Sequence, residues 1–132
     1  MKLVTIPRLH DPRGSLSVIE GAACPFPIRR VYYLYDIPSG EAQRGGHAHR
    51  LCHRLIFALS GSFRVEWAEP GKPKTNTMLN KPWEGLEVPP MTWMTLKDFS
   101  GGSVALILAS HEYDAADYMR DFDEWREACD AV

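Results

Sequence analysis

The sequence lacks the features of a membrane-spanning or nucleic-acid-binding protein. Its longest apolar run, SVALILAS, is far shorter than the roughly 20 residues that a membrane-spanning helix needs. The formal net charge of −2 at pH 7 provides no electrostatic attraction to nucleic acid, and no basic stripe stands out. We therefore expect neither a membrane nor a nucleic acid as a partner.

Cysteine is also scarce, and its spacing excludes two classes of site. Cys24, Cys52 and Cys129 are an odd number, lie far apart and include no CxxC pair. This pattern argues against a disulfide framework and a structural zinc site, and favours buried free thiols. Pro7 interrupts the N-terminal segment before the apolar core of a signal peptide could form. We therefore expect a cytoplasmic protein.

The chain has the size and apolar content of one folded domain. It has 132 residues, of which 45% are hydrophobic, and domains commonly have roughly 100–150 residues. Short apolar or alternating runs recur between turn residues, which is typical of an all-β antiparallel sandwich or barrel. The predicted strands are LSVIE, IRRVYYLYDI, HRLIFALSG, SFRVEWAE, KTNTMLN, GLEVPP, TWMTLK and SVALILAS. We predict a single domain over residues 1–132.

The C-terminal segment DFDEWREACDA is the one segment with a helical pattern. Phe122, Trp125 and Cys129 share one stripe at helical spacing. Asp121 followed three residues later by Glu124 is typical of an N-cap with a capping-box glutamate. We expect one short helix that packs on the sheet and carries no chemistry.

The stretch RGGHAHRLCHRL holds three histidines within seven positions. In a strand, His47 and His49 point to the same face, because side chains alternate. Two imidazoles on the inner face of a barrel can hold a metal, or can take and return protons near neutral pH. His53 shares their face only if the strand runs unbroken, since a turn or bulge near residues 50–52 reverses the alternation.

The His-x-His motif followed by Gly61 resembles the first motif of the cupin superfamily. In the longer spacing of that motif a ligand glutamate stands seven residues before the glycine, where this chain has Arg54. A guanidinium stays protonated and cannot bind a cation. The second cupin motif normally brings another histidine to the PPMTWM region, where this chain has Trp93. Two of the usual ligands are missing, so we expect no metal.

A more specific resemblance covers nearly the whole chain. The blocks RRVYYLYD, RGGHAH and LAS-x-x-Y-x-x-x-D-Y-x-R together are similar to the sugar nucleotide 3,4-ketoisomerases. This resemblance implies an RmlC-like cupin jelly-roll barrel with a short C-terminal helix, a dTDP-linked 4-keto-6-deoxyhexose as substrate, no cofactor and a homodimer. It also implies a role in making 3-amino sugars, in which the product goes to an aminotransferase. Arg54 departs from the family pattern, which often has glutamine there.

The resemblance also suggests roles for individual residues. It implies proton transfer by the histidine pair, with His49 as the base at C3 and His47 serving the sugar oxygens or delivering the second proton. Tyr32 or Tyr33 could hydrogen-bond a sugar oxygen, but they point to opposite faces and the periodicity does not choose between them. Aromatic packing is the alternative for both rings.

A nucleoside diphosphate calls for arginine side chains, which bind phosphate through paired N–H donors. The candidates are Arg44 beside the histidines, Arg30, Arg13 in a turn, and Arg54. Trp93 is either a wall of the sugar site or a core residue. Two alternatives to the isomerase stay open, namely a nucleotide-sugar 3,5-epimerase and a non-catalytic sugar-nucleotide-binding cupin.

Overall fold

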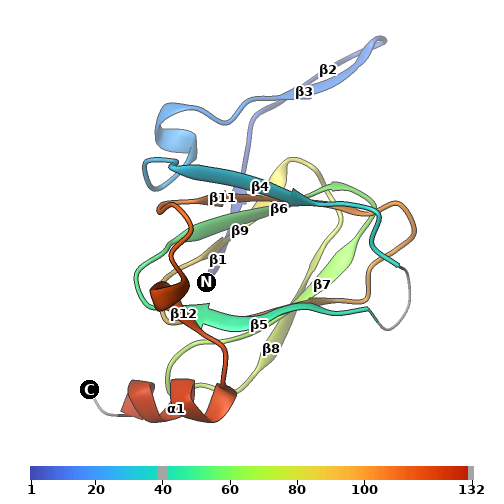
Figure 1. The fold of residues 1–132 in the computed structure, drawn as a ribbon. Coiled ribbons are helices and arrows are strands. Elements are labelled where there is room, and N and C mark those ends of the chain that lie inside the picture. The colour runs from blue at the N-terminus through green and yellow to red at the C-terminus, as the bar shows by residue number, and fades with distance from the viewer. Residues whose placement is uncertain (39–41, 131–132) are drawn as a thin grey trace.

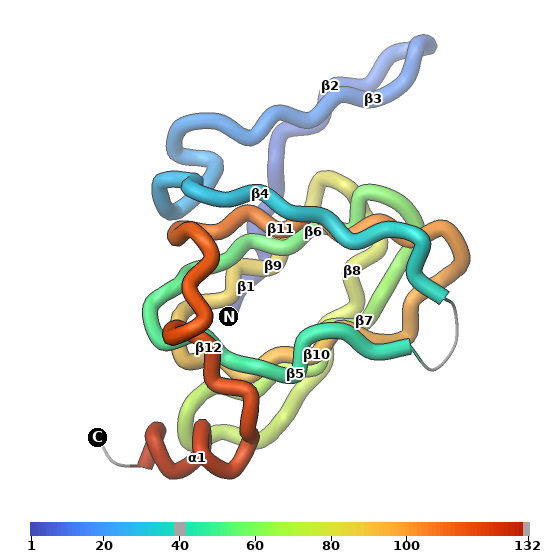
Figure 2. Tube along the Cα trace, viewed as in Figure 1, coloured from blue at the N-terminus to red at the C-terminus, as the bar shows by residue number. Residues whose placement is uncertain are grey.

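Two five-stranded antiparallel sheets face each other and form the body of the protein (Figures 1 and 2). The computed structural model describes residues 1–38 and 42–130. The first sheet has the order β1 (Lys2–Thr5), β9 (Glu84–Val88), β6 (Arg54–Ser60), β11 (Val104–Ala109) and β4 (Arg30–Leu34). The second has the order β12 (Tyr118–Met119), β5 (Arg44–His49), β10 (Trp93–Lys97), β7 (Phe63–Ala68) and β8 (Thr75–Leu79). Most neighbouring strands are far apart in sequence, as in a jelly roll.

Side-chain alternation divides the apolar residues between the interior and the two outer faces. On β6, Ile56 and Ala58 join the large cluster between the sheets, while Leu55 and Phe57 join a second cluster with Ile6 and Cys24. That second cluster shows that the N-terminal segment covers the outer face of the first sheet. The interior therefore receives every other residue of each strand, as the period of two requires.

The helix α1 (Phe122–Asp130) covers the outer face of the second sheet. The Asp121 carboxylate accepts a hydrogen bond from the Glu124 backbone N–H at 3.0 Å, which confirms the predicted N-cap. Trp125 is buried, and its indole N–H donates to the Met91 carbonyl at 3.0 Å. Phe122 and Cys129 pack beside it, as the predicted stripe requires. The final predicted helix residue, Ala131, lies outside the described residues.

The predicted strand LSVIE is wrong as a strand of the barrel. Its first part belongs to β3 (Gly14–Ser17), which pairs only with β2 (Arg8–Asp11) in a separate two-stranded sheet. All eight strand residues of this hairpin are exposed, and Figure 1 shows it projecting from the barrel beyond β4. Its alternation of apolar and polar residues has the period of a strand, but the barrel does not cover its apolar side. The pattern also missed β1, β2 and β12.

Two short 3₁₀ helices connect these strands. They are η1 (Gly21–Ala23), which precedes β4, and η2 (Ala115–Asp117), which precedes β12. The Asp114 carboxylate caps η2 by accepting from the Ala116 backbone N–H at 3.0 Å. This turn fixes the position of Asp117 directly before β12. Within residues 1–38 and 42–130, no helix has the length and apolar composition to cross a membrane.

Candidate active site

Strand β5 points His47 and His49 into the barrel interior. Ala48, between them, lies in the cluster beneath α1, so the alternation directs both imidazoles to the opposite face. Their ring centroids are 5.0 Å apart, with planes at 78°. His49 is 1% exposed, and His47 is partly buried. The predicted shared face of the two histidines is confirmed.

A glycine bulge before the histidines sets this orientation. The register between β10 and β5 shifts by one residue, because Met94 pairs with His47 and Thr95 pairs with Gly45. Gly45 and Gly46 have φ values of +93° and +70°. A Cβ on Gly45 would lie 3.1 Å from the Met94 carbonyl oxygen, so the close approach of the two strands and the positive φ both require glycine there.

Asp117 holds His49 in one orientation and one tautomer. The imidazole Nδ1–H donates to Asp117 Oδ2 at 2.9 Å. The same carboxylate accepts from the backbone N–H groups of Leu51 at 2.7 Å and Cys52 at 3.2 Å. With the proton on Nδ1, His49 Nε2 carries a free lone pair, and this buried atom has no hydrogen-bond partner among the described residues. That is the arrangement of a general base held by a carboxylate.

The surroundings keep both imidazoles neutral at pH 7. Burial and the charge of Arg54 lower the pKa of His49 to about 4, although Asp117 opposes the shift. Burial, Arg54 and the neighbouring His49 lower the pKa of His47 to about 3. Burial alone would raise the pKa of Asp117, but its hydrogen bonds from His49 and the two backbone N–H groups lower it. Asp117 is therefore the ionised partner of a neutral histidine.

Two residues that sequence reasoning missed complete this group. Asp117 lies 68 residues from His49 in the sequence, and β12 pairs Tyr118 directly with His49. The Tyr118 ring centroid lies 4.2 Å from that of His49 and 4.9 Å from that of His47. The motif LAS-x-x-Y-x-x-x-D-Y-x-R contains both residues and was the available signal. No local sequence pattern predicts that the segment containing Asp117 and Tyr118 pairs with β5.

Arg54 occupies the interior position next to His47. It is completely buried, and its Nη1 lies 3.4 Å from His47 Nε2. A guanidinium only donates, so Nε2 of His47 is the acceptor. Burial lowers the pKa of Arg54. Its Nε and Nη2 atoms have no hydrogen-bond partner within the described part of the chain.

The two candidate tyrosines lie on opposite faces of β4. Tyr32 packs against the interior cluster, and burial raises its pKa although the charges of Arg54 and Arg30 oppose the shift. The Arg30 guanidinium lies over the Tyr32 ring at 4.9 Å, so both residues are on the inner face. Tyr33 is 59% exposed on the outer face. The structure therefore brings Tyr32, and not Tyr33, to the histidine site.

The other predicted binding residues lie away from the histidines. Trp93 is buried on the outer face beneath α1, with its ring centroid 5.3 Å from that of Phe122. This position is that of a packing residue and not of a wall of the interior. Arg13 is exposed in the hairpin turn, where it forms a salt bridge with Asp11 at 2.8 Å. Arg44 is exposed at the start of β5.

His53 does not share the face of the histidine pair. A turn at residues 50–52 reverses the alternation, so Arg54 faces the interior. The His53 ring lies 4.8 Å from Phe26, and its Nε2 lies 3.4 Å from a Glu87 carboxylate oxygen. The structure thus separates His53 from His47 and His49, and a three-histidine site is excluded.

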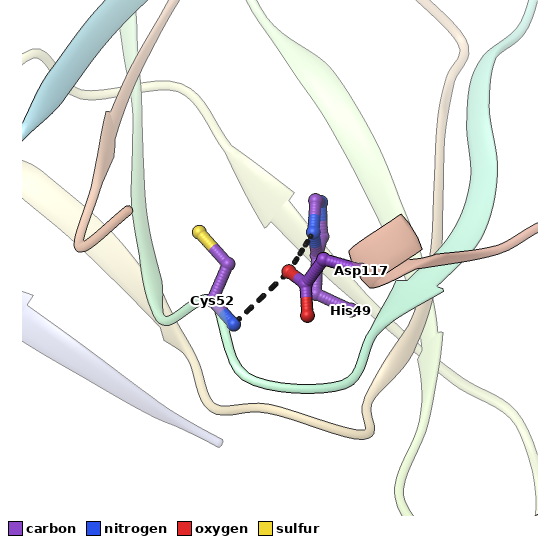
Figure 3. Close-up of side chains that lie close together, drawn as sticks. All are labelled: His49, Cys52 and Asp117. Atoms are coloured by element: carbon purple, nitrogen blue, oxygen red, sulfur yellow. Dashed lines mark hydrogen bonds and ion pairs between the residues drawn. The ribbon is translucent and has the colours of Figure 1, made fainter. Parts of the chain in front are cut away.

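The side chains of His49, Cys52 and Asp117 have possible metal-ligand atoms within 4.8 Å of one another (Figure 3). The atoms of His49 and Asp117 in this group are already engaged, because Nδ1 donates to the carboxylate. Figure 3 also shows that Cys52 contacts Asp117 through its backbone nitrogen and not its thiol. A cation here would have to replace the hydrogen bond that orients His49. The geometry therefore fits a positioned base better than a metal centre.

Comparison with known families and structures identifies the family of the chain. The family described as "FdtA: WxcM-like, C-terminal" matches residues 1–130. The chain belongs to this family. A curated relative, the TDP-4-oxo-6-deoxy-α-D-glucose-3,4-oxoisomerase of Aneurinibacillus thermoaerophilus, is 39% identical over 127 residues, which cover 96% of this chain and 90% of the relative.

Solved structures of sugar 3,4-ketoisomerases share the fold over almost the whole chain. QdtA from Thermoanaerobacterium thermosaccharolyticum, solved in complex with TDP, is 34% identical with a TM-score of 0.93, and the match covers 98% of this chain and 94% of that one. The TDP-quinovose 3,4-ketoisomerase WlaRB of Campylobacter jejuni is 37% identical with a TM-score of 0.89, covering 96% of each chain. The predicted all-β cupin barrel with a short C-terminal helix is confirmed.

Proposed function

We propose that this protein is a 3,4-ketoisomerase of a dTDP-linked 4-keto-6-deoxyhexose and that His49 is its general base. The observation that carries the proposal is the free Nε2 of His49, which faces the barrel interior while Asp117 fixes the opposite ring nitrogen. A module that only binds a sugar nucleotide does not need an oriented, neutral imidazole with an unused lone pair. Membership of the FdtA family and the activities named for its relatives support the same reaction.

The reaction moves a carbonyl from C4 to C3 in three proton transfers. His49 Nε2 takes the proton from C3, the C–H electrons form a C3–C4 double bond, and the C4 oxygen becomes negative. A proton then passes from the C3 hydroxyl to the C4 oxygen. Finally the imidazolium or another donor protonates C4, and the electrons on the C3 oxygen form the new carbonyl. We assign the oxygen-to-oxygen transfer to His47, whose ring adjoins that of His49.

Interior side chains provide contacts for the sugar oxygens. Tyr32 lies on the inner face of β4, so we assign the predicted tyrosine role to it in place of Tyr33. Tyr118 contacts both imidazoles and is a second candidate donor. For the diphosphate we propose Arg30, at the inner face of β4, and Arg44, at the exposed start of β5. Arg13 stays a prediction, because the hairpin holds it away from the histidines within one chain.

Product analysis by proton NMR tests the reaction. The purified protein is incubated with dTDP-4-keto-6-deoxyglucose, and we expect the carbonyl to move from C4 to C3. Inversion at C3 or C5 without movement of the carbonyl would replace the proposal with the epimerase. Unchanged substrate that nevertheless binds would replace it with the non-catalytic module. Activity in a chelator-treated, metal-free preparation tests the prediction that no metal or other cofactor takes part.

We propose a homodimer in the cytoplasm as the working form. The hairpin exposes Leu9 at 65% and Leu16 at 57%, and the outer face of the edge strand β4 exposes Val31 and Tyr33. Apolar side chains gathered on a projecting hairpin and an open sheet edge favour burial against a second copy. Light scattering after size exclusion should give twice the chain mass. Leu16→Asp should reduce it to one chain, and Met78→Asp, on β8 of the second sheet, should not.

A further inference from the structure

The interior of the barrel contains two arginines at the same level. Arg30 on β4 and Arg54 on β6 both pair with Ala109 of β11, which lies between them. Ala109 is fully buried and has only a methyl side chain, so it leaves space between the two longer side chains. The geometry places two positive charges on the inner face of the first sheet, within the barrel interior that the histidines also face.

The two arginines differ in how their charge is compensated. Arg30 is partly exposed, and its guanidinium lies over the rings of Tyr32 at 4.9 Å and Tyr113 at 5.9 Å. Arg54 is completely buried and forms no salt bridge with any carboxylate of residues 1–38 and 42–130. Its hydrogen bond to neutral His47 is long, and the neutral Tyr32 side chain also lies close to the guanidinium. Among residues 1–38 and 42–130, Arg54 is therefore a cation without a carboxylate partner.

A buried unpaired guanidinium is costly for a fold. Moving a charge out of water without a partner costs several kcal/mol even after relaxation, and an apolar residue of similar size at such a position is often neutral or stabilising. The next inward positions on β6 are Ile56 and Ala58, so the same strand supplies apolar residues to the interior. Packing does not explain why Arg54 interrupts this series, whereas an anion that forms in the site does.

We propose that Arg54 is a catalytic residue whose Nε–H and Nη2–H groups bind the enediolate oxygen formed when His49 removes the C3 proton. This inference rests on the proposed function. The electrons of the C3–H bond enter the C3–C4 double bond, and those of the C4 carbonyl move to its oxygen, which gains a full negative charge. Arg54 donates hydrogen bonds to that oxygen and gives up no proton, because a guanidinium stays protonated.

The position of Arg54 suits a charge that develops during the reaction. Preorganised donors accelerate a reaction when they bind the transition state more strongly than the substrate. Arg54 Nη1 contacts His47, and the His47 ring lies beside that of His49. The guanidinium and the base therefore lie on either side of His47. The diphosphate is a permanent charge, and partly exposed Arg30 and exposed Arg44 can reach it without being enclosed in the barrel.

The test compares Arg54→Met, which removes the charge and the N–H donors, with Arg54→Lys, which keeps the charge. The matched control is Arg64→Met on β7, which removes an outward guanidinium paired with Asp98. We measure kcat and KM by NMR, dTDP affinity by calorimetry, and exchange of the C3 proton in deuterated water. Removing one oxyanion donor commonly lowers kcat by about 10²–10³-fold. We expect a loss of that size in Arg54→Met, a smaller loss in Arg54→Lys, and wild-type values in Arg64→Met.

The affinity measurement separates catalysis from substrate binding. Arg54→Met should bind dTDP within about threefold of wild type, and its C3 exchange should slow together with kcat. A dTDP affinity that falls while kcat at saturation is unchanged would make Arg54 a nucleotide ligand and overturn the proposal. A kcat within about threefold of wild type in both variants would overturn it as well.

Two further controls keep the result decisive. Circular dichroism and thermal melting establish that each variant is folded, and if Arg54→Met does not fold, the loss expected of Arg54→Lys still decides the question. Wild-type protein must first convert the substrate to the 3-keto product. If it does not, the proposed function fails and the role of Arg54 fails with it. If wild type is active and both Arg54 variants match it, only the role of Arg54 is rejected.

Discussion

The two ends of the barrel interior share strand β6 but have opposite character. One end is filled by an apolar cluster that includes Phe63, Val65 and Leu96. The other end holds His47, His49 and Arg54, all largely removed from water. On β6 the change occurs within two residues, from Arg54 to Ile56. The apolar end stabilises the fold. Burial of the polar and charged side chains at the other end lowers stability, which is typical of a site kept for its chemistry.

The largest expected effect at the polar end follows from His49→Asn. Asparagine is similar in size but cannot take the C3 proton, so kcat should fall by at least about 10³-fold, at the upper part of the range for a positioned base. The melting temperature should change little, since the buried site keeps a polar side chain. Exchange of the C3 proton with deuterated water measures the loss directly. Exchange at the wild-type rate would remove His49 from the mechanism.

Phe63→Ala at the apolar end should have the reverse effect. The Phe63 ring is completely buried and lies 5.4 Å from Phe99, so its removal leaves a cavity in the largest cluster. Such changes lower the free energy of unfolding by about 3–5 kcal/mol. Denaturant unfolding measures it, and kcat should stay within about threefold at a temperature where the variant is folded. A loss of kcat equal to that of His49→Asn would mean that the two ends are not separate.

Asp117→Asn should affect the polar end less than loss of the base itself. The amide keeps the size of the side chain but can no longer act as the charged acceptor that holds the Nδ1–H tautomer of His49. We expect kcat to fall by about 10–100-fold, the range found when a histidine loses an orienting partner at a metal site, with KM nearly unchanged. Asp123→Asn, on the exposed face of α1, is the matched control.

The pH profile distinguishes positioning by Asp117 from general loss of structure. The negative charge of Asp117 raises the pKa of His49 against the effect of burial, so its removal should lower that pKa further. The acid limb of the wild-type profile reflects protonation of the base, with activity present above the pKa and lost below it. The Asp117→Asn limb should therefore move to lower pH. An unchanged limb would mean that Asp117 acts on the fold and not through His49.

Sequence patterns predicted the apolar end and the histidine pair because both depend on local alternation. The runs around Phe63 and Ile56 became β7 and β6, and the spacing of His47 and His49 fixed their shared face. The partner of His49 was not predictable in this way, since Asp117 reaches it only through the pairing of β12 with β5. The inner face of β4, and with it the choice of Tyr32, depends on where the other sheet lies.

The LSVIE segment was misjudged, and the place of Trp93 was left open, for a related reason. Alternation indicates that a segment is a strand but does not say which surface covers it. The LSVIE segment therefore became part of an exposed hairpin, and Trp93 became a packing residue beneath α1. Arg54 was identified as a departure from the cupin pattern, yet its burial, and the lack of a carboxylate partner among the residues that the structure describes, could be seen only in three dimensions.

The smallest expected effect is the loss of stability that the buried histidines of the polar end cause at low pH. The pKa values of His47 and His49, about 3 and about 4, lie below the ordinary value of 6.5, so between pH 6.5 and 4 the unfolded chain binds protons that the folded chain does not. The free energy of unfolding must then fall as the pH falls, by at most about 1.4 kcal/mol per pH unit for each histidine.

Urea unfolding from pH 7 to pH 4 measures this slope. His47→Asn should make it shallower, and His10→Asn, on the exposed hairpin, should not. An equal slope in wild type and His47→Asn would show that water already reaches the polar end, and the contrast between the two ends would then be one of composition and not of burial.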